Sequence, residues 1–327
     1  MPERTINQPF SLQERVLANG ALHNLGDVAT RYTIDRGGDR IFPSSISHTD
    51  PTVLYERFRK DPKTSLAFMR DNLFAVAHDK KVSEHTRHDR LSRYLDNYTS
   101  LTVKLDRAVF SDDGTVHEGV PDYIPDGLID MGQDRNIDPR YRNREQILID
   151  KAAIYTKYKK TLMDIFSSDI EGVSNSTMKG QIVTRLLLEV FREMPYNHQF
   201  DSRENNADVM PLHQLDNGVC RHIALTYQAL AQACGLTSRL VKCHVNNVAH
   251  SMSATRINGL WFITDPTIPD YTTRPDGTKE WRPGVHRLGY EEPKPGDAYT
   301  VQARHSGAIT HVVLRDNMYW RIANNEQ

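Results

Sequence analysis

The dipeptide Asn258-Gly259 separates two short runs with the composition of β-strands, residues 250–257 and 260–265. Asn-Gly is the strongest short-range signal for a two-residue hairpin turn, because both positions accept a positive φ. With Ile257 paired to Leu260, His250 and Asp265 fall on one face as diagonal neighbours, with β-carbons roughly 7–8 Å apart or less. A carboxylate placed there reaches one imidazole nitrogen and leaves the other for a third group.

The rest of the chain divides into a helical first part and a strand-rich second part. Apolar periodicity predicts helices over residues 88–110, 144–166, 177–193 and 219–233, with weaker helical turns over 51–77. Further strands are predicted over residues 238–245, 300–304, 309–314 and 318–322, the last two as a second hairpin around Asp316-Asn317. This order predicts an α+β fold.

Residues 111–140 hold four Gly, three Pro and eight Asp or Glu among 30 residues, which is typical of a long loop. We therefore expect two regions: a mostly helical N-terminal region over residues 1–140 that ends in this acidic loop, and a second domain over residues 141–327.

Cys220 stands at the first turn of the helix expected over residues 219–233. Backbone N–H groups and the helix dipole favour an anion there and lower the pKa of a thiol. A nucleophilic cysteine needs that help, a partner base, and a group that orients the base. Cys220, His250 and Asp265 are the residue types that such a site requires.

Four blocks in this order resemble the transglutaminase-like superfamily of papain-type thiol enzymes. The blocks are Gly218-Val219-Cys220-Arg221-His222, then Gly235-Leu236 with Arg239 and Val241, then His250, and then residues 259–267, Gly-Leu-Trp-Phe-Ile-Thr-Asp-Pro-Thr. The matching segment covers residues 177–270, under a third of the chain. The Cys-Arg-His block is also similar to a related domain in regulatory regions of certain plant protein kinases.

The resemblance implies a papain-like, transglutaminase-like core in which a helix carrying Cys220 packs on an antiparallel sheet. It implies Cys220 as nucleophile, His250 as general base and acid, and Asp265 as the carboxylate that orients His250. Gln214, six residues before Cys220, is the expected side-chain donor of the oxyanion hole, with Asn217 and His213 as alternatives. Such an enzyme acts on amide bonds of a protein or peptide through a thioester. Proteolysis, glutamine deamidation and cross-linking all remain open, and no metal or organic cofactor is needed.

Two other interpretations compete with catalysis by Cys220. The family commonly has an aromatic residue two places after its histidine, where this chain has Met252, and that departure favours an inactive binding or regulatory module. A zinc site is the chemical alternative, since Cys220, His222, Cys243, His244 and His250 are close in sequence. They lack the C-x2-C or H-x3-H spacing that structural zinc sites usually show.

Composition excludes some classes of partner. The chain has 41 Lys and Arg against 42 Asp and Glu, which does not favour bulk electrostatic binding of nucleic acid or of an anionic membrane. No apolar run approaches the roughly 20 residues that span a bilayer, and no signal peptide is apparent. Three cysteines, Cys220, Cys234 and Cys243, favour a reducing compartment over a disulfide framework. We expect a cytoplasmic protein, with export by a specialised secretion system as the alternative.

Overall fold

The computed structural model describes residues 73, 76–109, 116–118, 124, 126–130, 146–168, 175–197, 209–303, 306–315 and 320–322. Within these residues the fold is α+β, with five α-helices and two sheets, as the sequence predicts. Contacts between Cα atoms divide the chain into two compact units, residues 1–112 with 158–169 and residues 113–157 with 170–327. The predicted boundary near residue 140 lies outside the described residues.

The first unit contains two described helices, α4 (Glu84–Val109) and α6 (Lys159–Ser167). The two helices lie against each other, and both carry buried apolar side chains, among them Leu91, Leu95 and Leu162. At the surface, Lys159 Nζ lies 2.7 Å from Asp96 Oδ1. The predicted helical turns over residues 51–77 lie almost wholly outside the described residues.

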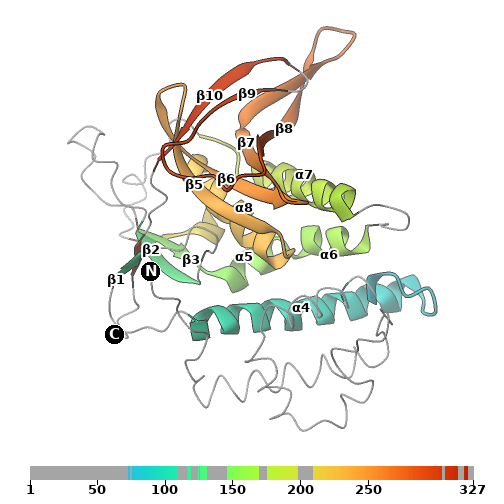
Figure 1. Cartoon of the computed structure of the whole chain (residues 1–327). Coiled ribbons are helices and arrows are strands. Elements are labelled where there is room, and N and C mark those ends of the chain that lie inside the picture. The colour runs from blue at the N-terminus through green and yellow to red at the C-terminus, as the bar shows by residue number, and fades with distance from the viewer. Residues whose placement is uncertain are drawn as a thin grey trace. The chain divides into compact units, whose positions relative to one another are not determined.

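The second unit holds three helices and both sheets (Figure 1). Its helices are α5 (Lys151–Lys157), α7 (Asn175–Glu193) and α8 (Cys220–Ala233), with a short 3-10 helix, η3 (Leu212–Gln214). The smaller sheet has the order β1-β11-β2-β3-β4, from Val116–Glu118, Trp320–Ile322, Gly127–Asp130, Gln146–Ile149 and Met210–Pro211. The larger sheet has the order β8-β7-β6-β5-β10-β9, from Lys279–Gly289, Leu260–Thr273, Val248–Ile257, Thr237–Val245, Ile309–Leu314 and Ala298–Gln302.

The hairpin between β6 and β7 has the predicted turn and register. Asn258 and Gly259 have φ angles of 51° and 82°, and Ile257 pairs with Leu260. The ladder continues to the pair Ser253 and Thr264 and ends there. The prediction that His250 and Asp265 share a face depends on this register, which is confirmed.

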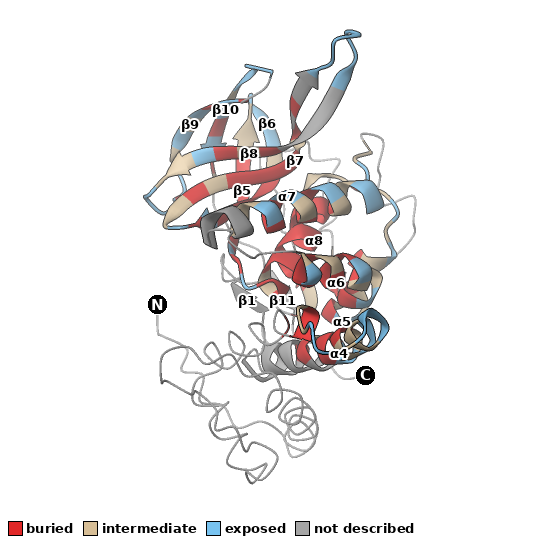
Figure 2. Cartoon of the chain, turned by 90° about the vertical axis from the view of Figure 1, so that its right-hand side faces the viewer, coloured by how far each residue is buried: buried red, intermediate tan, exposed pale blue. Residues whose placement is uncertain are grey.

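Helix α8 is buried along most of its length because the larger sheet covers one side and α5 and α7 cover others (Figure 2). The sheet presents small polar residues to it. Ser253 Oγ donates to the carbonyl oxygen of Ala224 at 3.2 Å, and Tyr227 shares a hydrogen bond with Thr255 at 2.9 Å. These bonds satisfy buried hydroxyl groups and fix the helix on the sheet.

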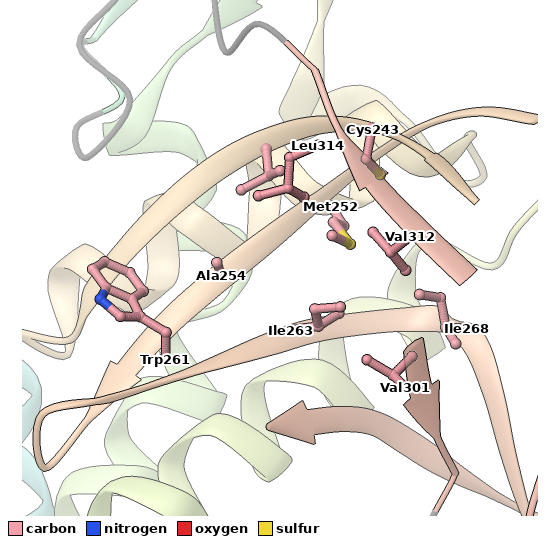
Figure 3. Packing of buried hydrophobic residues seen from close by; sticks show 10 residues of the cluster. Cys243, Met252, Ala254, Trp261, Ile263, Ile268, Val301, Val312 and Leu314 are labelled. Atoms are coloured by element: carbon pink, nitrogen blue, oxygen red, sulfur yellow. The ribbon is translucent and has the colours of Figure 1, made fainter. Parts of the chain in front are cut away.

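The opposite face of the sheet carries an apolar cluster. Its buried members are Val241, Cys243, Met252, Ala254, Trp261, Ile263, Ile268, Val301, Val312 and Leu314. Figure 3 shows Met252 among Cys243, Val312 and Leu314. Met252 is 1% exposed, so the position where the family commonly has an aromatic residue belongs to the protein interior.

Three predictions about secondary structure are wrong in part. The first part of the helix predicted over residues 144–166 is a strand instead, because Ile147 and Ile149 alternate into the core as β3, and the remainder forms two helices, α5 and α6. The predicted loop over 111–140 contains β1 and β2, and Asp126 within it is buried and accepts a hydrogen bond from Lys151 N–H. The predicted C-terminal hairpin is absent, since β10 pairs with β5 and β9 whereas β11 pairs with β1 and β2 of the other sheet.

No helix in the described part of the chain has both the length and the apolar character needed to cross a bilayer. None of the three cysteines forms a disulfide, and Cys234 and Cys243 are buried, as expected from their places at the end of α8 and within β5.

Candidate active site

Cys220 is the first residue of α8, where backbone N–H groups have no partner within the helix. The segment before it is fixed by pairing with residues 195–197. Gly218 N–H donates to Pro195 O at 3.2 Å, and Asn197 N–H donates to Gly218 O at 2.9 Å. A β-carbon on Gly218 would lie 3.0 Å from Nδ1 of His222, which accepts the Val219 N–H at 3.2 Å. Glycine thus leaves room for the imidazole that caps the helix.

His250 and Asp265 are brought together as the hairpin predicts. Nε2 of His250 and Oδ2 of Asp265 form a short hydrogen bond. Asp265 is 2% exposed, and its other oxygen, Oδ1, accepts the N–H and the hydroxyl of Thr267, both at 2.7 Å. Because Nε2 is engaged by Asp265, Nδ1 is the ring nitrogen left for Cys220, whose side chain also hydrogen-bonds to His250.

The thiol and the imidazole shift each other's protonation. Burial alone would raise the pKa of Cys220, but the hydrogen bond and charge of His250, with the Ser251 N–H and Arg221, lower it below its ordinary 9.0. Burial likewise opposes the charged form of His250, yet Asp265 and Cys220 outweigh it and raise the His250 pKa from 6.5 to about 10. Between the two pKa values, thiolate and imidazolium exist together.

Three contributors to this site were not found from the sequence. The Ser251 N–H and the Arg221 side chain both favour the thiolate of Cys220. Tyr196 is the third: burial raises its pKa, the charges of Cys220 and Asp265 raise it further, and Arg221 opposes them. Backbone pairing with Gly218 places Tyr196, and no local sequence pattern predicts this long-range contact.

The expected oxyanion residues lie on the segment before α8. Gln214 ends η3 and is exposed, while Lys157 Nζ donates to the carbonyl oxygens on either side of it, those of His213 at 3.2 Å and Leu215 at 3.0 Å. The lysine therefore holds the backbone around Gln214. The oxygen of Asn217 accepts a hydrogen bond from Asn197 at 3.1 Å.

Gly284 on the next strand, β8, pairs with Asp265 at a point where the two backbones approach closely. Its β-carbon would lie 2.4 Å from Asp265 O and 2.6 Å from Ile268 O, at the bulge in β7. Because both neighbours are backbone atoms, we expect Gly284→Ala to cost about 1–3 kcal/mol in urea unfolding and to weaken the His250–Asp265 contact.

The matched control is Gly180→Ala in α7, where a β-carbon meets no atom within 4 Å. We expect it to leave the site intact and to stabilise the helix by about 0.5–1 kcal/mol. Equal stability of Gly284→Ala and the wild type would contradict the tight approach of β8 to β7.

The side chains that suggested zinc do not form a ligand cluster. Across the described residues, no three His, Cys, Asp or Glu side chains are arranged to hold a metal ion. His250 is bonded to Asp265, and His222 caps α8. The geometry therefore gives the zinc interpretation no support.

A thiol on a helix start, next to a buried His–Asp pair on an antiparallel sheet, is an arrangement suited to peptidase-like chemistry. A comparison with protein-family models also indicates a peptidase-like domain. Residues 133–259 match the family described as EDR1/CTR1/ARMC3, peptidase-like. The matched segment contains Cys220 and His250 and ends before Asp265. A comparison with curated proteins found no match. The closer relationship to the transglutaminase-like superfamily stays a prediction.

Proposed function

We propose that this protein is a cysteine-dependent acyl-transfer enzyme that acts on amide bonds through Cys220, His250 and Asp265. The observation that carries the proposal is the continuous chain of contacts from the Cys220 thiol to His250 and from His250 to the buried Asp265. The peptidase-like family match supports a hydrolase. We further propose that the larger sheet and α8 form a papain-like, transglutaminase-like core.

In the proposed mechanism, the Cys220 thiolate attacks the carbonyl carbon of an amide and forms a tetrahedral oxyanion. His250 gives its Nδ1 proton to the departing nitrogen as the C–N bond breaks, which leaves a thioester on Cys220 and a released amine. Water or a second amine then attacks the thioester, His250 accepts the proton, and the thiolate departs. Asp265 holds the ring orientation and stabilises the imidazolium throughout.

The oxyanion requires donors that point at it, and the Cys220 N–H at the start of α8 supplies one. We propose the Gln214 side chain as the second. The bonds from Lys157 hold the backbone on both sides of Gln214, which supports this role because it restricts the positions that the side chain can reach.

The substrate that we propose is a protein or peptide, and three products are possible in chemical terms. Incubation with a candidate substrate followed by mass spectrometry separates them. Cleavage fragments indicate proteolysis, the small mass gain of an amide converted to an acid indicates deamidation, and a joined product indicates cross-linking.

The test of the proposal is labelling of the native protein by a thiol-reactive probe at neutral pH. We expect one fast site that is lost in Cys220→Ala and retained in Cys234→Ala, because Cys234 is buried at the C-terminal end of α8, whereas Cys220 lies at the start of that helix beside His250. The probe reports the thiolate without any need to know the substrate.

The alternative is an inactive module that keeps the fold as a binding or regulatory domain. Slow labelling of Cys220, with a pKa that is not lowered from the ordinary 9.0, would favour it over the enzyme. Met252 packs in the interior, so its departure from the family pattern is weaker support for the inactive module than an exposed residue would be.

A further inference from the structure

Two thiols lie at opposite ends of one peptide group, the group that joins His250 to Ser251. At one end, the Cys243 S–H donates to the His250 carbonyl oxygen, with an S···O distance of 3.7 Å. At the other end, the Ser251 N–H donates to the Cys220 sulfur. The C=O and N–H of a trans peptide point in opposite directions, so the peptide lies between the two sulfurs as a bridge.

The Ser251 N–H is available for the thiolate because β6 extends beyond its neighbour. The ladder between β6 and β7 runs from the turn back to the pair Ser253 and Thr264 and does not include Ser251. On its other side β6 remains paired with β5, where Cys243 lies directly opposite His250. The same pairing that places Cys243 against the His250 carbonyl therefore leaves the Ser251 N–H directed away from β5.

Cys243 remains a donor at every pH at which the site works. Burial raises its pKa far above 9.0, and the nearby charges of Asp265 and Cys220 raise it further. The charged and titratable groups around Cys220 come from several elements: His250 on β6, Asp265 on β7, Cys243 on β5, Arg221 on α8, and Tyr196. Within this group, Cys243 is the buried neutral donor.

We propose that Cys243 is a positioning residue, whose thiol polarises the 250–251 peptide and so strengthens the bond from the Ser251 N–H to the Cys220 thiolate. Hydrogen bonds in a chain strengthen one another because each polarises the next. The inference rests on the proposed function in one respect, that Cys220 is the nucleophile.

The surroundings of Cys243 provide variants that separate donation from packing. Cys243 is 2% exposed and packs in the apolar cluster near Met252, Val312 and Leu314 (Figure 3). Alanine removes the donor and leaves a small cavity, valine fills the space without a donor, and serine keeps a donor but suits the apolar surroundings poorly. If Cys243 acts through packing, Cys243→Ser should change the Cys220 pKa as Cys243→Ala does. If it acts as a hydrogen-bond donor, Cys243→Ser should leave the Cys220 pKa as in the wild type.

The experiment is the pH profile of Cys220 alkylation by iodoacetamide in the full chain, with Cys220→Ala as the blank. We expect Cys243→Ala and Cys243→Val to raise the apparent pKa of Cys220 by roughly 0.2–0.6 pH units, and Cys243→Ser to restore the wild-type profile. Unchanged profiles in alanine and valine, or a serine profile that follows alanine, would overturn the inference while the proposed function stands. An ordinary thiol pKa for Cys220 in the wild type would contradict both the inference about Cys243 and the proposed function.

Discussion

His250→Ala is expected to reduce acyl transfer by on the order of 10⁴-fold or more, and to move thiolate formation at Cys220 to higher pH. The variant loses the acid that protonates the departing amine. It also loses the hydrogen bond and the charge that hold the Cys220 pKa down. Burial of Cys220 remains, and burial raises the pKa of a thiol, so we expect an apparent pKa at or above the ordinary 9.0.

The same variant changes how stability depends on pH. In the folded protein the His250 pKa is about 10, against an ordinary 6.5, so the imidazolium stabilises the fold fully below pH 6.5. That stabilisation decreases as the pH rises from 6.5 and is lost above about 10. We therefore expect the stability difference between wild type and His250→Ala in urea to be larger at pH 6 than at pH 10.

The control for His250→Ala is His286→Ala, which removes a buried imidazole from β8. His286 hydrogen-bonds to the backbone of Gln302, and Cys220 is not among the groups that shift the His286 pKa, so this variant should lose stability and keep the alkylation profile of Cys220. If His250→Ala alkylates with the wild-type profile, the proposed ion pair is wrong.

The part of the site that the sequence predicts correctly depends on one turn. Asn258-Gly259 fixes the register of the hairpin, and side chains alternate along a strand, so the meeting of His250 and Asp265 follows from local rules. The position of α8 follows in the same way: the apolar stripe predicts a helix that begins near Cys220, and Gly235, with a φ of 68°, ends it.

The contacts that the sequence does not predict join residues far apart in the chain. Tyr196 reaches the site through pairing with Gly218, and the Ser251 N–H is available because the ladder between β6 and β7 ends at Ser253 and Thr264. The sequence does not predict the strand β3, because its four residues pair with β2 and β4 from distant segments. In each case the local structure depends on a partner that is distant in sequence, and local propensity does not depend on that partner.

Asp265→Asn is expected to lower acyl transfer by on the order of 10³–10⁴-fold, as loss of the orienting carboxylate does in a Ser-His-Asp triad. Oδ1 of Asp265 accepts two hydrogen bonds from Thr267, so the single amide oxygen of asparagine is drawn to that side. Its NH₂ group then faces Nε2 of His250, which must accept, and the ring proton moves to Nδ1. A neutral ring held in that tautomer cannot take a proton from the thiol.

Asp270→Asn is the matched control for this variant, because Asp270 is also buried on β7 and accepts a backbone N–H, that of Ser306 at 2.9 Å. Both variants lose a buried carboxylate, but only Asp265→Asn removes the charge that raises the His250 pKa. We expect the alkylation profile of Cys220 to move to higher pH in Asp265→Asn and to stay in place in Asp270→Asn. Equal profiles in the two variants would show that Asp265 acts on Cys220 only through general stability, and the three residues would then not work as a unit.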